Sequence, residues 1–357
     1  MTATELPTAS LRIIDANFNR ASEGLRVVED YLRLGLNDHQ LTSICKHLRH
    51  ELSALTASIS PALRVAVRDT QNDVGTSVET DSEYEREDDA SVATANIKRV
   101  QQSLRCVEEF AKVVDPQLAR MIEPLRYRTY SLEKAFVINA DSRERLANRR
   151  LYVLLDGRRS SNEFVKLVSE LVSAGIHIIQ LRDKTLDDEE LIARARLLRK
   201  VVQGSDTLFI MNDRPDIALI AQADGVHVGQ EDLAVEDARR IVGPRAILGV
   251  STHSIKQSRE AVLDGANYIG VGPTFESETK QFESLPGLDF VREVSQEITL
   301  PTFAIGGITL DNLNSVLKAG ATRIALSHAI TGSNDPTRAA NTLLEQLANY
   351  GQTVATG

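Results

Sequence analysis

The segment Val271–Lys280 carries side chains suited to binding an oxyanion. Its sequence is VGPTFESETK, in which an apolar run ends and hydroxyl groups and an ammonium group follow. The hydroxyls belong to Thr274, Ser277 and Thr279, and Lys280 supplies the cation. Proteins bind phosphate with several short donors and a positive charge. The segment therefore predicts a phosphate-binding loop after a buried strand, with a solvated polar loop as the alternative for this segment alone.

Other apolar runs in the same half of the chain also end in polar residues. Gln180, Arg182 and Lys184 alternate along one side of an extended run. Comparable residues follow the other runs, and they are Asn212, Asp213, Asp232, Ser251, Gly306 and Gly307. Glycines let backbone N–H groups approach an anion. A charged loop at 182–184 and a helix N-cap near Asp213 are the structural alternatives, but the recurrence of such residues on successive runs favours a shared site.

Short apolar runs alternate with amphipathic segments from Leu151 to the C-terminus. We expect strands at 151–155, 176–181, 208–212, 225–228, 247–250, 268–271, 302–305 and 323–326. The segments between them, such as 162–174 and 188–202, repeat apolar residues at helical spacing. This pattern predicts a (β/α)8 TIM barrel, in which the carboxyl ends of the strands share one face. A doubly wound open sheet is the alternative, and it would spread the polar residues along a crevice.

In these motifs the chain resembles the thiamine-phosphate synthase family, also called thiamine-phosphate pyrophosphorylase. The matching motifs are QLRDK, the Asn212–Asp213 pair, GVHVGQED, GVSTH, GPxFxxxTK and AIGGI, in that order between about residues 150 and 340. Members of the family join hydroxymethylpyrimidine diphosphate to a thiazole phosphate, release pyrophosphate and require Mg²⁺. The resemblance implies a transferase of thiamine biosynthesis that acts on these two small molecules.

The resemblance also implies a role for each matched residue. Asp213 and Asp232 would hold Mg²⁺, which prefers carboxylate oxygens. The residues implied in catalysis are Arg182, Lys184, Ser251 and Lys280, all of which would also bind substrate. The other substrate-binding positions are Gln180, Asn212, Ser277, Thr279, Gly307, Ser327 and His328. The family's reaction resembles a dissociative substitution, which needs no protein nucleophile, and the barrel sequence contains no cysteine.

Two positions depart from the family pattern. Ser277 stands where the family has threonine, which keeps the hydroxyl but removes a methyl group. The segment 326–330 reads LSHAI where the family reads approximately VSAI, so His328 could donate to a phosphate or point away. For His227 and His253, which also lie at strand ends, we expect structural hydrogen bonds.

Residues 1–140 are expected to form a separate, mainly α-helical domain before the barrel at 141–357. This region contains an internal repeat, in which six residues recur 79 positions later. Asn17, Arg20, Leu25, Arg26, Val28 and Glu29 match Asn96, Arg99, Leu104, Arg105, Val107 and Glu108. The repeat predicts two related helical hairpins in one bundle. Between the copies, residues 64–69 alternate like a short strand.

Several functions stay open at this stage. A different phosphate-binding barrel enzyme, such as an isomerase or aldolase, would need a positioned base or a Schiff-base lysine. The N-terminal domain is similar to an extension associated with a hydroxymethylpyrimidine-phosphate kinase role, which would make the chain bifunctional. No glycine-rich nucleotide fingerprint supports ATP binding there. A non-catalytic interaction module is the third alternative.

Composition narrows the class of protein. The chain has 357 residues and a net charge of −9, which argues against a general nucleic-acid binder. No stretch is long and apolar enough to cross a membrane, and the N-terminus lacks a signal-peptide core. We therefore expect a cytoplasmic enzyme. Its two cysteines, Cys45 and Cys106, are expected to be reduced, and both a monomer and a homo-oligomer stay open.

Overall fold

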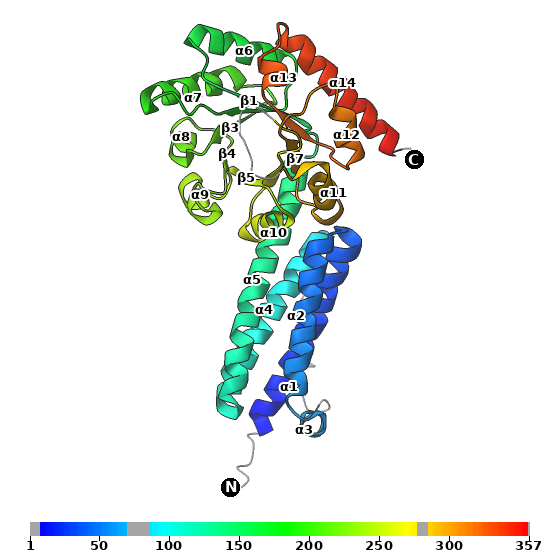
Figure 1. The fold of residues 1–357 in the computed structure, drawn as a ribbon. Helices are drawn as coiled ribbons and strands as arrows, with labels where there is room; N and C mark the ends of the chain where they lie inside the picture. The colour runs from blue at the N-terminus through cyan, green and yellow to red at the C-terminus, as the bar shows by residue number, and fades with distance from the viewer. Residues whose placement is uncertain (1–7, 70–85, 277–284, 356–357) are drawn as a thin grey trace. The chain divides into compact units, whose positions relative to one another are not determined.

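The computed structural model describes residues 8–69, 86–276 and 285–355. It divides into two compact units, Met1–Val137 and Ile138–Gly357, whose elements are labelled in Figure 1. The boundary falls within a long helix, α5 (Pro116–Arg145). The first unit is largely helical and the second is a barrel, so the predicted fold class is confirmed. The domain boundary at residue 140 stays a prediction.

The first unit is built around two long helices, α1 and α4. The helices are α1 (Thr8–Asp30), α2 (His39–Ala57), α3 (Pro61–Ala66), α4 (Asp89–Val114) and the first part of α5, with a π-helical turn at Tyr31–Gly35. A Cβ atom at Gly24 in α1 would lie 2.7 Å from Val100 Cγ2 in α4. The glycine therefore lets the two helices pack closely. Asn17 Nδ2 donates to Cys106 Sγ at 3.2 Å farther along the same contact.

The internal repeat is visible as two equivalent ion pairs. Arg49 Nε lies 2.7 Å from Glu29 Oε2, and Arg126 Nε lies 2.8 Å from Glu108 Oε2. The predicted pairs three residues apart are also present, Arg26–Glu29 at 3.7 Å and Arg105–Glu108 at 2.5 Å. Each carboxylate is nearly buried between its two arginines, so each hairpin uses the same ionic contact to join its helices.

The strand expected at 64–69 is wrong, because residues Pro61–Ala66 form the short helix α3. Pro61 occupies the first helical turn, where a missing N–H costs nothing. The helical spacing brings two arginines to one buried carboxylate. Arg64 Nη1 lies 3.3 Å from Asp15 Oδ1, and Arg68 Nε lies 2.6 Å from Asp15 Oδ2. This contact to α1 decides the local structure over the alternating pattern.

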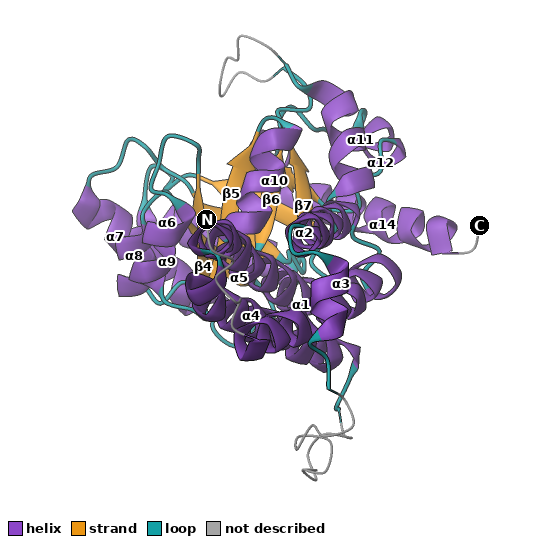
Figure 2. Ribbon diagram, turned by 90° about the horizontal axis from the view of Figure 1, so that it is seen from below, coloured by secondary structure: helices purple, strands orange, loops and turns teal. Residues whose placement is uncertain are grey.

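The second unit is a closed barrel of parallel strands in the order β1 to β8. The strands are β1 (Leu151–Leu155), β2 (Ile178–Leu181), β3 (Leu208–Asn212), β4 (Gly225–Val228), β5 (Ile247–Thr252), β6 (Tyr268–Val271), β7 (Thr302–Ile305) and β8 (Ile324–Leu326). In Figure 2 they form an orange core with purple helices outside it. The open-sheet alternative is therefore excluded.

Helices of the second unit follow the strands along the chain. They are α6 (Ser161–Ser173), α7 (Asp188–Val202), α8 (Pro215–Ile220), α9 (Val235–Val242), α10 (Ile255–Asp264), α11 (Gly287–Glu297), α12 (Leu313–Lys318), α13 (His328–Thr331) and α14 (Pro336–Ala355). Side chains cap three of their N-termini: Ser160, Asp187 and Ser254 each accept from the backbone N–H of the third helical residue. These caps fix where each helix leaves its loop.

The barrel interior is filled by large side chains in a cross-strand cluster. Tyr152, Tyr268 and Phe303 pack edge to face, with ring centroids 5.3 to 5.9 Å apart. A Cβ atom at Gly249 would lie only 2.0 Å from Tyr268 Cζ. Glycine in β5 therefore makes the space that the Tyr268 ring occupies.

The two ion pairs of the repeat predict unequal responses to substitution. Glu108→Ala leaves Arg126 unpaired with a side chain 8 % exposed, whereas Glu29→Ala leaves Arg49 with a side chain 26 % exposed. We expect Glu108→Ala to lower the free energy of unfolding by about 3–5 kcal/mol, the range for stranding a buried charge. Glu29→Ala should cost less, because Arg49 can reach water. Urea unfolding followed by circular dichroism measures both, and equal losses would contradict this account.

Candidate active site

The predicted site residues of the second unit come from the carboxyl ends of different strands. Gln180 lies in β2, Asn212 ends β3 and Ser251 lies near the end of β5. Asp213 follows β3 directly, and Asp232 follows β4. Because the barrel is closed and parallel, all these strand ends face the same side. The topology therefore brings the described members together at one mouth.

A pair of carboxylates stands at this mouth. Burial and the neighbouring Asp232 carboxylate together raise the pKa of Asp213 above its ordinary value. Lys184 offsets part of this effect, because its Nζ lies 3.2 Å from Asp213 Oδ2. Asp232 Oδ2 accepts a hydrogen bond from Gly229 N at 2.8 Å. The Asp213 carboxylate thus lies between a like charge and an ammonium group.

The backbone at Asp213 holds this arrangement in an uncommon conformation. Asp213 has a φ of 57°, in the left-handed region that asparagine and aspartate tolerate better than other residues with a side chain. Its N–H donates to the carbonyl of His227 at 2.8 Å, which ties the end of β3 to β4. The conformation turns the chain sharply at the strand end before Pro215 begins α8.

Asp183 has a structural role that separates it from its charged neighbours. Its Oδ2 accepts from Gly157 N at 2.9 Å, and its Oδ1 accepts from Thr185 N at 2.8 Å and Leu186 N at 3.0 Å. Burial alone would raise the pKa of Asp183, but these hydrogen bonds outweigh it and lower the pKa. Arg182, by contrast, forms no ion pair with any residue in the described ranges.

Below the carboxylates, polar side chains enter the barrel interior. Gln180 Nε2 donates to the Tyr152 hydroxyl at 2.6 Å, and the Tyr152 and Tyr268 hydroxyls lie 2.9 Å apart. His227 Nδ1 lies 3.0 Å from the Tyr268 hydroxyl, and its Nε2 lies 2.9 Å from Ser251 Oγ. Burial lowers the pKa of His227 to about 4, with Arg182 adding to the effect and Asp232 opposing it, so the ring is neutral near pH 7.

The two tyrosines were not predicted from the sequence. They occupy ordinary apolar strand positions, in LYVLL and YIGV, where an aromatic residue usually means core packing. Their polar role becomes visible only in the folded structure, where the two hydroxyl groups form a hydrogen bond between strands. The structural hydrogen bonds expected for His227 and His253 are present, since His253 Nδ1 lies 2.6 Å from the carbonyl of Gly272.

The predicted phosphate-binding loop is described only in part. Ser277, Thr279 and Lys280 lie outside the described residues, so their roles stay predictions. The Thr274 hydroxyl donates to the carbonyl of Ile305 at 3.0 Å and is buried. It joins the loop after β6 to β7, and it is therefore not an open oxyanion donor.

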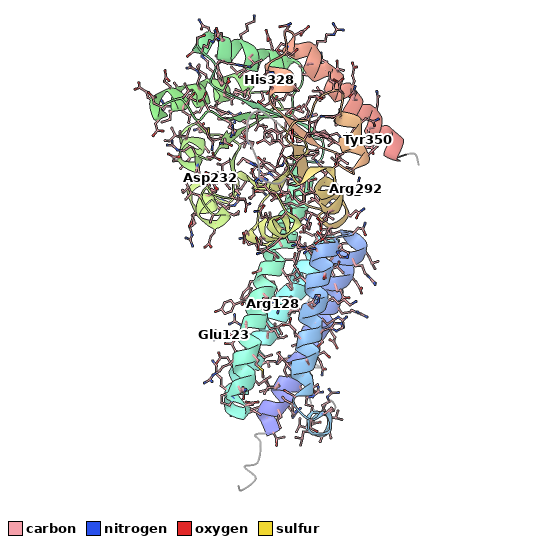
Figure 3. The ribbon with its side chains drawn as sticks, viewed as in Figure 1. Glu123, Arg128, Asp232, Arg292, His328 and Tyr350 are labelled. Atoms are coloured by element: carbon pink, nitrogen blue, oxygen red, sulfur yellow. The ribbon has the colours of Figure 1, made fainter. Side chains whose placement is uncertain are left out.

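The other residues predicted to bind the phosphate lie after β7 and β8. Gly306 and Gly307 have φ values of 100° and 63°, and a Cβ atom at Gly307 would lie 2.5 Å from the carbonyl oxygen of Glu276. Ser327 precedes α13, and His328 begins it. A Cβ atom at Gly332 would lie 2.4 Å from the His328 ring, so that ring extends along its own helix. Figure 3 labels His328 and Asp232 in the barrel unit.

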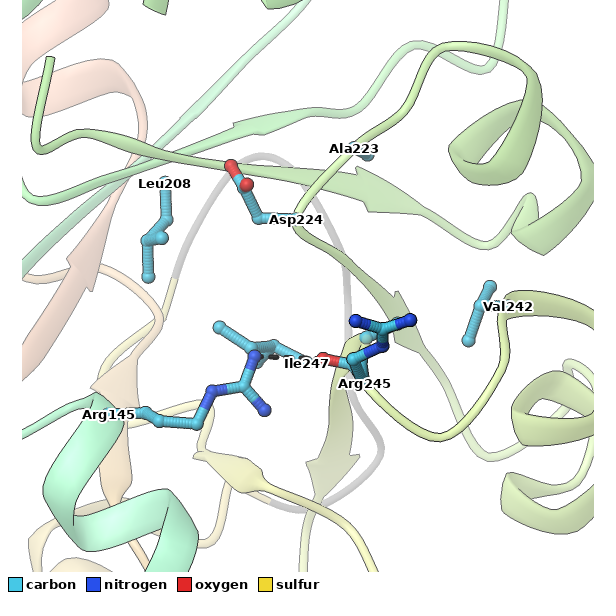
Figure 4. A pocket seen from close by; sticks show the side chains of 8 residues that line it. Arg145, Leu208, Ala223, Asp224, Val242, Arg245 and Ile247 are labelled. Atoms are coloured by element: carbon cyan, nitrogen blue, oxygen red, sulfur yellow. Dashed lines mark hydrogen bonds between the residues drawn. The ribbon is translucent and has the colours of Figure 1, made fainter. Parts of the chain in front are cut away.

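A separate hollow of about 470 Å³ lies at the other end of the strands. Arg145, Arg245 and Asp224 line it together with Leu208 and Ile247 (Figure 4). Leu208 and Ile247 are the first residues of β3 and β5, so this hollow opens on the amino-terminal side of the barrel. It is therefore distinct from the mouth that holds the predicted site.

Comparisons with known proteins identify the family. Residues 151–330 match the family described as thiamine monophosphate synthase. A thiamine-phosphate synthase of Rhodopirellula baltica is 45 % identical over 340 residues, which cover 92 % of this chain and 90 % of that protein. The chain belongs to the thiamine-phosphate synthase family. A family member from Gloeobacter violaceus is 42 % identical over 337 residues, covering 94 % of this chain and 96 % of that protein.

Both units of the chain have counterparts. Residues 12–135 match the ThiD2 family. A solved thiamine phosphate pyrophosphorylase from Pyrococcus furiosus is 35 % identical, with a TM-score of 0.52, and covers 57 % of this chain and 96 % of that one. The synthase family thus includes proteins that match this chain almost throughout and one that matches only part of it. Among the described helices, none has the length and apolar character required to cross a bilayer.

The pKa of Asp213 predicts a pH-dependent gain in stability for Asp213→Asn. A carboxyl group whose pKa is raised on folding destabilises the folded state once it ionises, and this cost is absent below the ordinary value of 3.8. With a chelator present, the variant should unfold at a higher temperature than the wild type at pH 7. The difference should shrink as the pH falls toward 3.8. Asparagine also tolerates the left-handed backbone there.

Asp183→Asn is the matched control with the opposite sign. The pKa of Asp183 is lowered on folding, so its carboxylate stabilises the folded state above its ordinary pKa. The variant should be less stable than the wild type at neutral pH. Differential scanning calorimetry at several pH values measures both, and a loss of stability in Asp213→Asn at pH 7 would contradict a net cost of ionising Asp213 in the folded protein.

Proposed function

We propose that this chain joins hydroxymethylpyrimidine diphosphate to a thiazole phosphate and forms thiamine phosphate and pyrophosphate. The observation that supports it best is the mouth of the barrel, where the Asp213 and Asp232 carboxylates and the Lys184 ammonium group lie above a neutral polar interior. The charged mouth suits the diphosphate group of the substrate, and the neutral interior suits its uncharged pyrimidine ring. Membership of the synthase family gives the same reaction class.

The donor set fits Mg²⁺. Within the described residues no group of three or more acidic, histidine or cysteine side chains could hold a metal ion. The proposed site is therefore a sparse one of two carboxylates, Asp213 and Asp232. Such a site suits Mg²⁺, which keeps positions open for substrate phosphate oxygens and water. Burial and the neighbouring Asp232 carboxylate raise the pKa of Asp213, and a bound divalent ion would oppose both effects. When bound, Mg²⁺ would neutralise negative charge on the diphosphate.

The residues of the chain divide between the two substrates. Arg182, Lys184 and Lys280 bind the diphosphate, while Gln180, Asn212 and Ser251 hold the pyrimidine. The thiazole phosphate lies against a set of hydroxyl and backbone donors, and these belong to Ser277, Thr279, Gly307, Ser327 and His328. The cationic side chains then stand where the leaving group gains charge, which is where electrostatic stabilisation has the largest effect on rate.

The proposed reaction needs no covalent enzyme intermediate. The bond between the pyrimidine methylene and the diphosphate oxygen breaks, and its electron pair leaves with pyrophosphate. The thiazole nitrogen lone pair then forms the new bond to the methylene carbon. Both cysteines of the chain, Cys45 and Cys106, lie in the first unit. Burial raises the pKa of the Cys45 thiol to about 12, which makes it a poor nucleophile.

The direct test is to incubate the purified chain with both substrates and Mg²⁺ and to measure thiamine phosphate and pyrophosphate by chromatography. Equal amounts of the two products are expected. A different phosphate-handling reaction, such as an isomerisation or aldol cleavage, would give neither product. Cytoplasmic location and oligomeric state stay predictions from the sequence.

Lys280→Ala should lower kcat by about 10²-fold or more, the scale for losing one preorganised electrostatic group. Lys280→Arg should recover only part of the rate, because a planar guanidinium differs from a compact ammonium group. Lys256→Ala is the control, since Lys256 is an exposed residue of α10 paired with Glu260. Steady-state kinetics distinguish the cases. If the only defect of Lys280→Ala is a modestly raised KM, Lys280 is a peripheral binding residue.

A truncated chain that begins at Ile138 should fold and still make thiamine phosphate from the diphosphate. The P. furiosus protein matches 57 % of this chain over 96 % of its own length, which supports an independent barrel. Ile138 is chosen because Asn139 Nδ2 donates to Thr299 Oγ1 at 2.8 Å within the second unit. A truncated chain that is well folded but inactive would show that the first unit takes part in the coupling reaction.

The match of residues 12–135 to the ThiD2 family favours a separate role for the first unit. If this unit is a hydroxymethylpyrimidine-phosphate kinase, only the full-length chain will use the monophosphate together with ATP. Arg26→Ala and Arg105→Ala should then impair that step and spare the coupling reaction. If the unit is a non-catalytic interaction module, the full-length chain will not use the monophosphate, and deletion of the unit will change only assembly or partner binding.

A further inference from the structure

Five polar side chains form a continuous hydrogen-bonded chain across the barrel interior. In order they are Gln180, Tyr152, Tyr268, His227 and Ser251, from strands β2, β1, β6, β4 and β5. Tyr152, Tyr268 and Gln180 are at most 2 % exposed. These three residues are shielded from water and depend on their neighbours in the chain for hydrogen bonding, whereas His227 and Ser251 are half-buried.

The number of available protons restricts how the chain can be arranged. Each tyrosine hydroxyl has one proton, and the neutral imidazole has one proton on one of its nitrogens. When all the links are made and neither tyrosine O–H nor the imidazole N–H is left without an acceptor, the protons point in the same direction along the whole chain. Either Gln180 donates at the first link, or Ser251 donates at the last. The two ends are therefore coupled.

The orientation of Gln180 selects one of these two arrangements. Its Nε2 donates to the Tyr152 hydroxyl. In the arrangement that follows, Tyr152 donates to the Tyr268 hydroxyl 2.9 Å away, and Tyr268 donates to His227 Nδ1 3.0 Å away. His227 then carries its proton on Nε2 and donates to Ser251 Oγ. The Ser251 proton is left free to donate elsewhere. At the other end, Gln180 Oε1 is buried and has no hydrogen-bond partner in the described structure.

The unpartnered buried oxygen at one end and the free hydroxyl proton at the other can both be satisfied by one ligand bound at the mouth. A buried acceptor without a donor is costly, and both ends lie on strands that open at the mouth. The ligand must present a donor to Gln180 Oε1 and an acceptor to Ser251. An aminopyrimidine has this pattern, because its exocyclic amino group donates beside a ring nitrogen that accepts. The corresponding oxo compound has the reverse pattern.

We propose that Tyr152, Tyr268 and His227 are positioning residues that lock Gln180 as an acceptor and Ser251 as a donor, and so select an amino over an oxo pyrimidine. The proposal rests on the proposed function, since it assumes that the pyrimidine binds between Gln180 and Ser251. To accept an oxo ring, the amide must rotate and every proton in the chain must reverse together. Without the chain, each end could reorient separately.

Tyr268→Phe tests the proposal, because it removes the central hydroxyl and keeps the ring that Gly249 accommodates. The measured quantity is the ratio of kcat/KM for the aminopyrimidine diphosphate to that for its oxo analogue. Loss of the chain should lower this ratio about tenfold, the scale of one net hydrogen bond. Tyr152→Phe should lower it equally. The double variant should have the same ratio as either single variant, because loss of one hydroxyl already uncouples Gln180 from Ser251.

Phe303→Leu is the matched control. Phe303 packs on both tyrosines, with ring centroids 5.3 and 5.4 Å away, but contributes no hydroxyl. Its substitution should change stability and leave the ratio at the wild-type value. Calorimetric binding of pyrophosphate with Mg²⁺ reports whether each variant keeps an intact mouth. An unchanged ratio in both tyrosine variants that bind pyrophosphate, or an equal fall in Phe303→Leu, overturns the proposal.

The same experiment separates the two levels of inference. If the wild-type chain fails to use the aminopyrimidine diphosphate at all, the proposed function is wrong. If the wild type uses it and the tyrosine variants discriminate as well as the wild type, only the hydrogen-bonded chain is wrong. Additive losses in the double variant would also overturn it, because they would indicate independent structural damage.

Discussion

Closure of the parallel sheet is the constraint on which the candidate site depends. Every strand of the closed barrel is paired on both sides, so the sheet has no free edge. Side chains alternate along each strand, pointing either into the barrel or toward the surrounding helices. The strand ends then share one side, and residues as distant in sequence as Gln180 and Ser251 converge there. The polar residues are separated in the sequence because the site takes a contribution from one strand after another.

The same closure makes the interior a place where polar atoms must be satisfied within the protein. Tyr152 and Tyr268 fill the barrel as aromatic rings and also join their hydroxyls at 2.9 Å. Gly249 leaves the space for this packing, since the Cβ atom of any larger residue would overlap the Tyr268 ring. Packing and hydrogen bonding are therefore not independent here. The rings hold the hydroxyls in line, and the hydroxyls orient Gln180 and His227.

The first unit uses charge in a different way. Its duplicated Glu–Arg contacts lie between helices and repeat with the same atoms, Nε to Oε2, in both hairpins. These carboxylates are satisfied by arginines of the bundle itself. At the barrel mouth, Asp213 lies beside the like charge of Asp232 and pairs with the exposed Lys184, while Asp232 accepts from the backbone N–H of Gly229. The carboxylates of the first unit therefore have structural contacts, whereas the like-charged pair at the mouth is where we propose that a cation binds.

The sequence alone determined the fold class and the family, and it predicted which polar residues lie at the carboxyl ends of the strands. Alternating strand and helix patterns are local properties, and α7 was predicted with the bounds that the structure gives it. The helix Pro61–Ala66 was missed because its contact to Asp15 is distant in sequence. Tyr152 and Tyr268 were missed for the same reason, since an inward tyrosine has the same local pattern as any core aromatic residue.

Tertiary structure decided what each polar atom contacts. The sequence placed Asp183 among charged neighbours, but only the fold showed that backbone N–H groups already satisfy its oxygens. It also showed that the Thr274 hydroxyl is bonded to Ile305, and that Gln180 Oε1 is buried without a partner. Sequence patterns record which face of a strand a residue occupies, because backbone periodicity sets that face. Hydrogen-bond partners depend on strand register and barrel closure, which bring distant residues within about 3 Å.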